Sequence, residues 1–421
     1  MSMTDERSLR HSSSGRCSDD TLDTKIKIGH LFGILFLFIN PFIALFFQAL
    51  LSLRIRVPKF ILILFASLSF ATFFFNRQYG IYWYPGASDD VPIYLNLYLS
   101  NRGQTFSVLW SRFIESPNGN EILWFLPWSI ILNEFGAREE VFIFLHYLLN
   151  FVALFISMRL LSRRYWIAFV LVYFFLTPIT LVGMAHIWRQ QLAFSIFLSG
   201  IALKYQRRSL VGILLIYISP FMHVSAAFFV LSYWVFLLFR RNHIFDRKTR
   251  FALLLGVLMV LIPICTKMTV IALNALGMER IMSYYQGDDG STIRVYLLMI
   301  VYALPMLAIF FWFRTDDINR IFLLLNFAVF SLVLALPSAN GIYDRLLMFS
   351  LPLMGIFFYR CLIENFSQKL QMPALIIIFF IGTYRLYVPT RNGAGVMNFV
   401  ANGQSFDPFM GLGKVLLYWG L

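Results

Sequence analysis

The sequence predicts an all-α polytopic membrane protein, and three observations support this fold class. Hydrophobic residues make up 59% of the 421 residues, whereas a soluble domain is about 45 to 50% apolar. The apolar residues form repeated runs of about 17 to 25 residues, the length that an α-helix needs to cross the hydrocarbon core. The runs are densely apolar, unlike the alternating strands of a transmembrane β-barrel.

We expect about twelve membrane helices, with a range of about 10 to 14, because each long apolar run is long enough to span. The run 122–135 is too short to span comfortably and contains Pro127, so we expect it to be re-entrant or interfacial. The predicted helices are 30–53, 58–75, 138–160, 165–183, 188–204, 208–221, 223–239, 251–273, 293–313, 318–336, 343–363 and 372–388.

The chain divides into one membrane domain with two tails. Residues 1–29 are polar, with balanced acidic and basic side chains, and we expect this tail to be disordered. Residues 30–388 form the membrane domain, and 389–421 form a Gly-rich C-terminal tail that we expect to be periplasmic. The three cysteines have no metal-ligand spacing, so we expect no metal site and no cofactor.

The net charge of +14 comes largely from short basic loops between apolar runs. Such loops set membrane topology, and this pattern does not indicate a nucleic-acid partner. The basic loops mark alternate connections, so we expect them to be cytoplasmic and the N-terminus to be outside. The distinctive polar residues then gather on one external face, in the loop 76–121 and the turns 185–188, 220–223 and 337–344.

His186, Arg189 and Gln190 lie at the external mouth of the predicted helix 188–204. Their spacing of three and four residues would place them on one helical face. An arginine near hydrocarbon costs roughly 2.5 kcal/mol or more, and a guanidinium suits bidentate phosphate binding. The alternative is that Arg189 snorkels to the interface and His186 is simply hydrated.

The segment 220–226 places His223 and Ser225 where the next helix is expected to open after Pro220. The partial positive charge of a helix N-terminus would keep His223 neutral and able to accept a proton. The alternative is that His223 only caps a helix end. Ser225 is expected to be a cap rather than a nucleophile.

The external loop 76–98 combines Arg77 and a Gly-Pro turn with paired acids and several tyrosines. Carboxylates bind sugar hydroxyls and aromatic faces stack on sugar rings, so this loop suits a carbohydrate, and one of two adjacent acids can stay protonated. The alternative is an interfacial aromatic belt with solvated acids. The acids are Asp89 and Asp90, the tyrosines expected to contact sugar are Tyr84 and Tyr94, and Glu121 is a further external carboxylate.

Asp344 and Arg345 lie together where the predicted helix 343–363 begins on the external side. An aspartate that orients an arginine is a common device in phosphate sites, although a charge pair at a helix start is also ordinary. We favour a phosphate-binding role for Arg345. His146, inside a predicted helix, is expected to be a satisfied core residue.

These residues together resemble the EpsG-type exopolysaccharide polymerases, which are related to the Wzy polymerases of O-antigen and capsule. The resemblance rests on an outward N-terminus, Arg77 before a Gly, Asp and Tyr loop, and a Glu121-led segment. It also rests on the Arg-Gln-Gln-Leu-Ala run at 189–193, the His-Val-Ser-Ala run at 223–226 and the late external Arg345. It covers residues 30–390, and the first-loop Gly-to-Asp spacing is longer than the family's usual form.

The resemblance implies a GT-C-like helical bundle with its active site on the periplasmic face of the bacterial inner membrane. The implied reaction transfers a glycan from undecaprenyl pyrophosphate to a new lipid-linked repeat unit, without a metal. Arg189, Arg345 and Arg77 would hold the pyrophosphate. His223, Asp89, Asp90, Glu121 or His186 would act on the acceptor proton, and Tyr84, Tyr94, Trp188, Gln190 and Asp344 would contact sugars.

Other readings stay open at this point. The chain could be another lipid-linked-sugar glycosyltransferase, an O-antigen ligase or a membrane acyltransferase. A non-enzymatic flippase is less favoured, because its charge would be expected along the bundle centre rather than at one face. The expected partners are the lipid-linked oligosaccharide and the bilayer, with a separate flippase and a chain-length regulator as further candidates.

Overall fold

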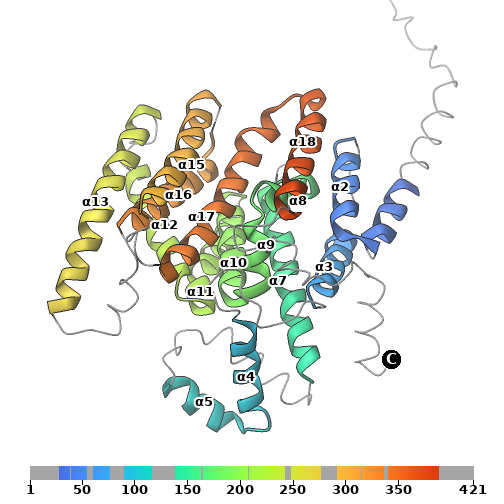
Figure 1. Cartoon of the computed structure of the whole chain (residues 1–421), viewed down its shortest axis with the longest axis horizontal. Coiled ribbons are helices and arrows are strands. Elements are labelled where there is room, and N and C mark those ends of the chain that lie inside the picture. Colours follow the sequence, from blue (N-terminus) through green and yellow to red (C-terminus); the bar gives the residue numbers. More distant parts are fainter. Residues whose placement is uncertain are drawn as a thin grey trace, which may run out of the picture.

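The computed structural model describes residues 28–37, 39–54, 60–75, 90–115, 138–162, 165–206, 208–241, 248–275, 292–313, 315–335 and 340–387. All regular structure within these ranges is helical, which confirms the predicted class (Figure 1). Four of the described helices are long and apolar enough to cross a membrane, or five if one bent pair counts as a single span. Twelve spans and a GT-C-like bundle stay predictions.

Most predicted helices are present within a few residues of their expected bounds. An unlabelled helix, Ile28–Leu37, comes first. The labelled helices are α2 (Pro41–Ser52), α3 (Phe60–Phe75), α4 (Val91–Asn101), α5 (Phe106–Glu115), α7 (Glu139–Leu161), α8 (Trp166–Leu176), α9 (Ile179–His186), α10 (Trp188–Tyr205), α11 (Ser209–Met222), α12 (Ala226–Arg241), α13 (Lys248–Ala275), α15 (Thr292–Trp312), α16 (Asp317–Ala335), α17 (Asn340–Cys361) and α18 (Gln368–Tyr387), with a short 3-10 turn, η3 (Ile363–Asn365).

Two predicted single spans are broken. The expected helix 30–53 is interrupted at Asn40, whose side chain accepts hydrogen bonds from two backbone N–H groups and so starts α2. The expected helix 165–183 is two helices, α8 and α9, bent by 90° at Pro178. Proline lacks a backbone N–H donor and clashes with the preceding turn, so it ends one helix and starts another.

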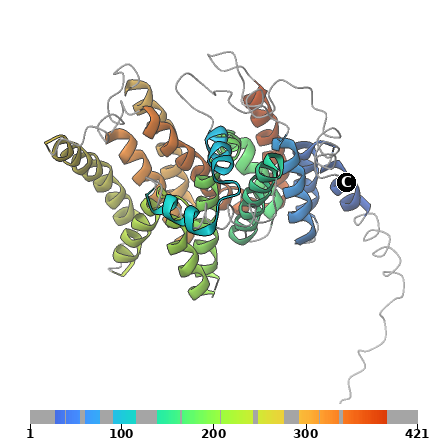
Figure 2. The same cartoon turned by 90° about the horizontal axis from the view of Figure 1, so that it is seen from below.

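The predicted external loop 76–121 contains two helices, α4 and α5. Figure 1 shows both below the bundle, and Figure 2 shows them across its lower face. The expected re-entrant run 122–135, residues 1–27 and residues 388–421 lie outside the described residues. The helical content of this loop was missed because its apolar residues are interleaved with polar ones over short stretches.

Helices α10 and α11 form a tight hairpin because two glycines let their backbones touch. A Cβ on Gly212 would lie 2.4 Å from the backbone nitrogen of Lys204, and one on Gly200 would lie 2.8 Å from that of Ile216. Small residues allow such close approach between membrane helices. If this antiparallel register is continued along α11, His223 lies at the same height along the helix axis as Ala193. Ala193 is about one helical turn after Arg189 in α10.

Three helices run in parallel and are joined by one aromatic cluster. The ring of Phe349 in α17 lies 4.6 Å from that of Phe229 in α12 and 5.7 Å from that of Phe194 in α10. Edge-to-face and tilted ring pairs at these separations are favourable. The cluster of Phe194, Phe229 and Phe349 holds the N-terminal halves of α10, α12 and α17 side by side.

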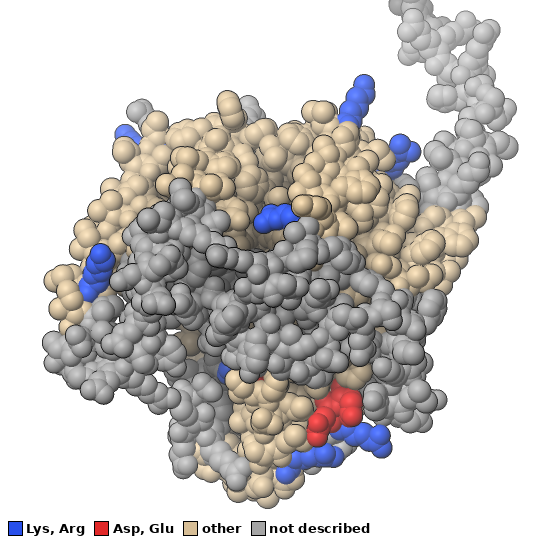
Figure 3. All heavy atoms as spheres, viewed as in Figure 1, with Lys and Arg blue, Asp and Glu red and all other residues tan. Residues whose placement is uncertain are grey.

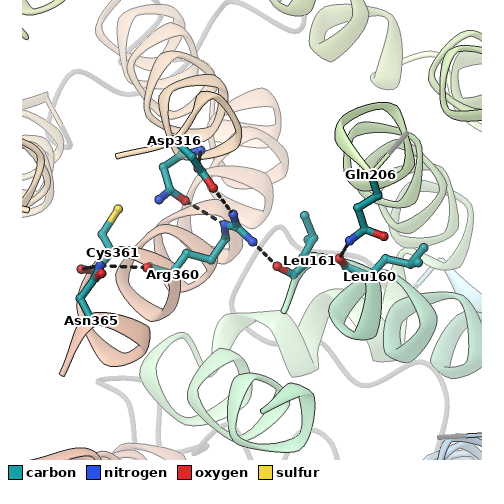
Figure 4. A network of polar contacts seen from close by, with 8 residues as sticks. Leu160, Leu161, Gln206, Asp316, Arg360, Cys361 and Asn365 are labelled. Atoms are coloured by element: carbon teal, nitrogen blue, oxygen red, sulfur yellow. Dashed lines mark hydrogen bonds and ion pairs between the residues drawn. The ribbon is translucent and has the colours of Figure 1, made fainter. Parts of the chain in front are cut away.

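The opposite end of the bundle is held by a buried arginine (Figure 4). Arg360 is 4% exposed, and its Nη2 lies 2.6 Å from the Asp316 carboxylate. Its Nε donates to the Asn319 side chain at 2.9 Å, and its Nη1 donates to the Leu161 carbonyl. The network therefore ties the end of α17 to the end of α7 and to the segment that starts α16.

Other contacts gather at this same end, which we call the basic end. Arg240 forms an ion pair with Asp317 at 2.8 Å, and Lys248 donates to the carbonyls of Phe311 and Phe313. The Gln368 side chain donates to the Leu53 carbonyl. The basic helix ends are thus on one face of the bundle, as predicted, while the side of the membrane that this face occupies stays a prediction.

A Gly212→Ala substitution should destabilise the protein by about 1 to 3 kcal/mol, because the added methyl group forces two backbones apart. Gly256→Ala is the matched control, since a Cβ there meets nothing within 4 Å. Thermal unfolding in detergent measures both variants. Equal stability of the two would contradict the close α10–α11 contact.

Arg360→Leu should cost about 3 kcal/mol of stability, because it leaves the buried Asn319 and Leu161 acceptors, and the partly exposed Asp316 carboxylate, without their donor. Arg240→Leu should cost about 1 kcal/mol or less, because that arginine is half exposed. The two unfolding midpoints provide the comparison. Similar losses from both variants would show that the Arg360 network is not the main tie at the basic end.

Candidate functional site

The candidate site begins at a helix break between α9 and α10. Ile187 has φ −107° and ψ 60°, which is not helical, so His186 ends α9 and Trp188 starts α10. The prediction that His186, Arg189 and Gln190 share one helical face is therefore wrong. The Tyr147 hydroxyl of α7 donates to the Ala185 carbonyl at 3.1 Å, beside the break, so α7 helps to fix this corner of the backbone.

Trp188 forms the floor of the site. Its side chain is fully buried; its ring stacks on His146 with centroids 5.1 Å apart and meets Tyr147 edge-on at 4.9 Å. His146 is itself fully buried and its Nδ1 lies 2.7 Å from the Phe142 carbonyl, which agrees with its expected place in the core. Because protein rings cover Trp188, its expected stacking on a sugar does not fit this arrangement.

Arg189 lies above this floor and against the ring of Tyr94. Its guanidinium carbon is 4.8 Å from the Tyr94 ring centroid, a cation–π distance. The same ring lies 5.5 Å from that of Trp188, and its hydroxyl donates to the Asp90 carboxylate at 3.2 Å. Helix α4 therefore brings an acid to the mouth of α10, and Tyr94 connects that acid to Arg189.

Helix α4 is anchored to α7 by a second tyrosine. Tyr98 stacks flat on Phe142, with centroids 4.4 Å apart and an angle of 10°. Burial raises the pKa of Tyr98, and the nearby Arg102 charge opposes that rise. Tyr98 therefore stays protonated at neutral pH and serves as a packing residue. Asp90 and Tyr94 are both less than one-tenth exposed, so the acid is held inside the α4 contact.

His223 lies in the turn between α11 and α12. The prediction that Pro220 ends the helix is wrong, because α11 continues to Met222. His223 precedes the first residue of α12 by three positions. Its Nδ1 lies 2.6 Å from the Ser225 hydroxyl and accepts the Ser225 backbone N–H at 3.2 Å. With Nδ1 as acceptor, a neutral His223 carries its proton on Nε2, and its Nδ1 accepts a hydrogen bond from the Ser225 hydroxyl.

Arg345 and Gln190 can be placed relative to the aromatic cluster. Arg345 in α17, Gln190 in α10 and Ser225 just before α12 each stand one turn ahead of a phenylalanine of that cluster. The three backbones therefore surround one region at the same end of the bundle. The side chains of Asp344 and Arg345 are outside the described residues, whereas Gln190 is buried.

Four expected site residues, Arg77, Tyr84, Asp89 and Glu121, lie outside the described residues. The described residues contain no group of three or more His, Cys, Asp or Glu side chains that could hold a metal ion. In Figure 3 the described surface is mostly uncharged, and the acidic side chains visible on this face gather near the lower end of α7.

The electrostatics of this end favour an anion. Helices α10 and α12 begin here, with Arg189 in the first turn of α10 and Ser225 just before α12, while Arg345 lies in the second turn of α17, which starts at Asn340 rather than beside Asp344 as predicted. Helix α7 also begins here, but Glu139 and Glu140 in its first turn offset its N-terminal charge. Each helix N-terminus carries roughly half a positive charge, and unpaired first-turn N–H groups bind phosphates well. Arg189 adds a full charge to this region.

The comparison with protein families identifies the family of this chain. The model of the EpsG family matches residues 81–400, which include α4, α10, the His223 turn and α17. The chain belongs to the EpsG family. Neither the comparison with curated proteins nor that with solved structures found a match. The EpsG match begins after Arg77, so that arginine and the first helices lie outside the matched segment.

The sequence analysis did not identify Tyr147, nor the role of His146 in packing against Trp188. Both are on α7 and contact Trp188, and in the sequence a histidine and a tyrosine next to each other interrupt an apolar run. That interruption was the available signal. Its meaning depended on Trp188, which is far away in the sequence.

Trp188→Ala should destabilise the protein by about 3 to 5 kcal/mol, because it removes a fully buried ring from the floor of the site. Trp110→Ala is the control, since that ring is 38% exposed, and it should change stability far less. Detergent-solubilised protein unfolded by heat gives both values. A stability loss no larger than that of the control would mean that Trp188 is free for ligand contact.

Proposed function

We propose that this EpsG-family chain is a membrane polysaccharide polymerase that joins repeat units carried on undecaprenyl pyrophosphate. The reaction would occur at the periplasmic face of the bacterial inner membrane, in synthesis of exopolysaccharide, capsule or O-antigen. The observation that carries the proposal is Arg189, held over Tyr94 beside Asp90 where parallel helices begin. A partly buried cation at this position suits a pyrophosphate group.

In the proposed step, the bond between the sugar anomeric carbon and the pyrophosphate oxygen breaks. A hydroxyl oxygen of the acceptor repeat unit forms the new bond to that carbon, and its proton moves to a base. The pyrophosphate leaves with additional negative charge. Arg189, Arg345 and Arg77 would stabilise that charge, which is the usual role of preorganised donors aimed at a developing anion.

Two groups are candidates for the base. Asp90 accepts a hydrogen bond from Tyr94, whose ring lies against Arg189, so Asp90 is a candidate to receive a proton beside the leaving group. His223 is the other candidate. Because the Ser225 hydroxyl is hydrogen-bonded to His223 Nδ1, a proton would reach Nδ1 by way of that hydroxyl, which passes on its own proton as it takes up that of the acceptor. Asp89, Glu121 and His186 stay alternatives.

The supporting residues have a revised division of roles. Trp188 and Tyr94 would position Arg189, because their rings are buried against protein. Contacts to sugar would fall to Tyr84 and Asp344, because Gln190 is buried as well. A separate flippase and a chain-length regulator are the proposed protein partners, since a polymerase of this kind needs a supply of lipid-linked units on its own face of the membrane.

Arg189→Ala should leave the protein in the membrane but reduce the glycan product to single repeat units. Loss of one such donor lowers a rate by about 10²- to 10³-fold. Arg189→Lys should give glycan lengths between those of the wild type and of Arg189→Ala, because a lysine keeps the charge without the bidentate guanidinium. The readout is glycan length on a gel of extracted polysaccharide.

Arg345→Ala should give the same product, and Arg54→Ala at the basic end is the control that should give full-length glycan. Immunoblotting of membranes checks that each variant is present in equal amount. Wild-type chain lengths in both Arg189→Ala and Arg345→Ala would overturn the assignment of the pyrophosphate site.

A further inference from the structure

An open apolar groove runs along α13 where it faces α15. Its volume is about 840 Å³, within the range of roughly 300 to 1,000 Å³ found for small-molecule sites. Gly256 contributes to its floor, and a Cβ there would meet nothing within 4 Å. The groove is lined by Thr249, Ala252, Leu253, Gly256, Val257, Val260, Leu261 and Phe311.

The groove lies along a membrane span and starts at its interface. The span Lys248–Met268 has a mean hydropathy of 2.3, and only 17% of it is buried within the protein. Lys248 joins α13 to the end of α15 by donating to the Phe311 and Phe313 carbonyls. Trp312, 84% exposed, lies at this end of α15, as interfacial aromatic residues do.

The length of the groove matches one leaflet. From Thr249 to Leu261 the helix rises about 18 Å, at about 1.5 Å per residue. Half of a hydrocarbon core is about 15 Å. A single acyl chain that starts at the interface would therefore end near the far end of the groove, and a chain that crosses both leaflets would extend beyond it.

The mouth of the groove is basic. Arg250 stands one turn before Leu253 on the same face of α13 and is exposed. Among the described residues Arg250 has no ion pair, and Lys248 uses two of its three N–H donors on carbonyls. The nearby acids among the described residues are already engaged, since Asp316 pairs with Arg360 and Asp317 pairs with Arg240. Within the part of the chain that the structure describes, the positive charge of Arg250 is therefore not balanced by an acid.

We propose that this groove binds one anionic phospholipid from the leaflet at the basic end. One acyl chain lies along Leu253, Gly256 and Val260, and the phosphate lies at Arg250 and Lys248. Basic pockets between membrane helices bind anionic head groups in this way. A second copy of the chain is a poorer occupant. A two-fold axis along the membrane normal would bring the basic ends of two grooves together at the same membrane depth, where their positive charges would repel.

The test is native mass spectrometry of the full chain purified from mixed micelles that contain equal amounts of phosphatidylglycerol and phosphatidylcholine. Wild type should retain one phosphatidylglycerol in preference to phosphatidylcholine. Arg250→Ala should reduce that preference about fivefold, which corresponds to about 1 kcal/mol per basic residue near the surface. Gly256→Leu should fill the groove and lower retention of both lipids, with no loss of fold because its Cβ has open space.

Matched controls separate this site from general effects. Arg54→Ala removes an exposed basic residue at the same end but away from the groove, and Leu210→Phe enlarges a lipid-facing residue of α11 that is 71% exposed. Neither should change lipid retention. Equal retention of the two lipids by wild type, unchanged retention in Gly256→Leu, or a disulfide-linked dimer formed through Val257→Cys would each overturn the proposal.

Discussion

The contact between the backbones of α10 and α11 is the constraint on which the candidate site depends. Gly200 and Gly212 let the two helices approach until main-chain atoms touch. Because the hairpin is then held in one register, the turn that carries His223 lies level with the first turns of α10. A looser hairpin could slide, and the distance between His223 and Arg189 would no longer be determined by the fold.

Aromatic packing carries this register to the remaining parts of the site. Phe194, Phe229 and Phe349 hold the N-terminal halves of α10, α12 and α17 together. On the other side of α10, Trp188 is packed against α7 and Tyr94 of α4. Rigid rings suit this purpose because they bury a large area with few rotatable bonds. Arg189 is therefore held by residues from several helices.

Polar groups are divided between the two ends of the bundle with different consequences. At the basic end, Arg360 is nearly fully buried and its donors go to Asp316, Asn319 and Leu161, so the charge is used for structure. At the site end, Arg189 is only partly buried and lies over an aromatic ring. A charge that is partly exposed among helix N-termini can still receive an anion. The difference in burial separates a structural arginine from a candidate functional one.

The sequence by itself determined the helical class, the bounds of most helices and the residues at the site end. Long apolar runs and basic connections are local signals, and an arginine beside an apolar run costs free energy wherever the chain folds. It did not reveal the breaks at Asn40 and Pro178 or the two helices within 76–121. Only the tertiary structure decided that Trp188 is a floor, that Tyr94 links Asp90 to Arg189 and that Ser225 occupies His223 Nδ1. These are contacts between separate helices or within a turn, and they depend on helix register and packing, which no local pattern contains.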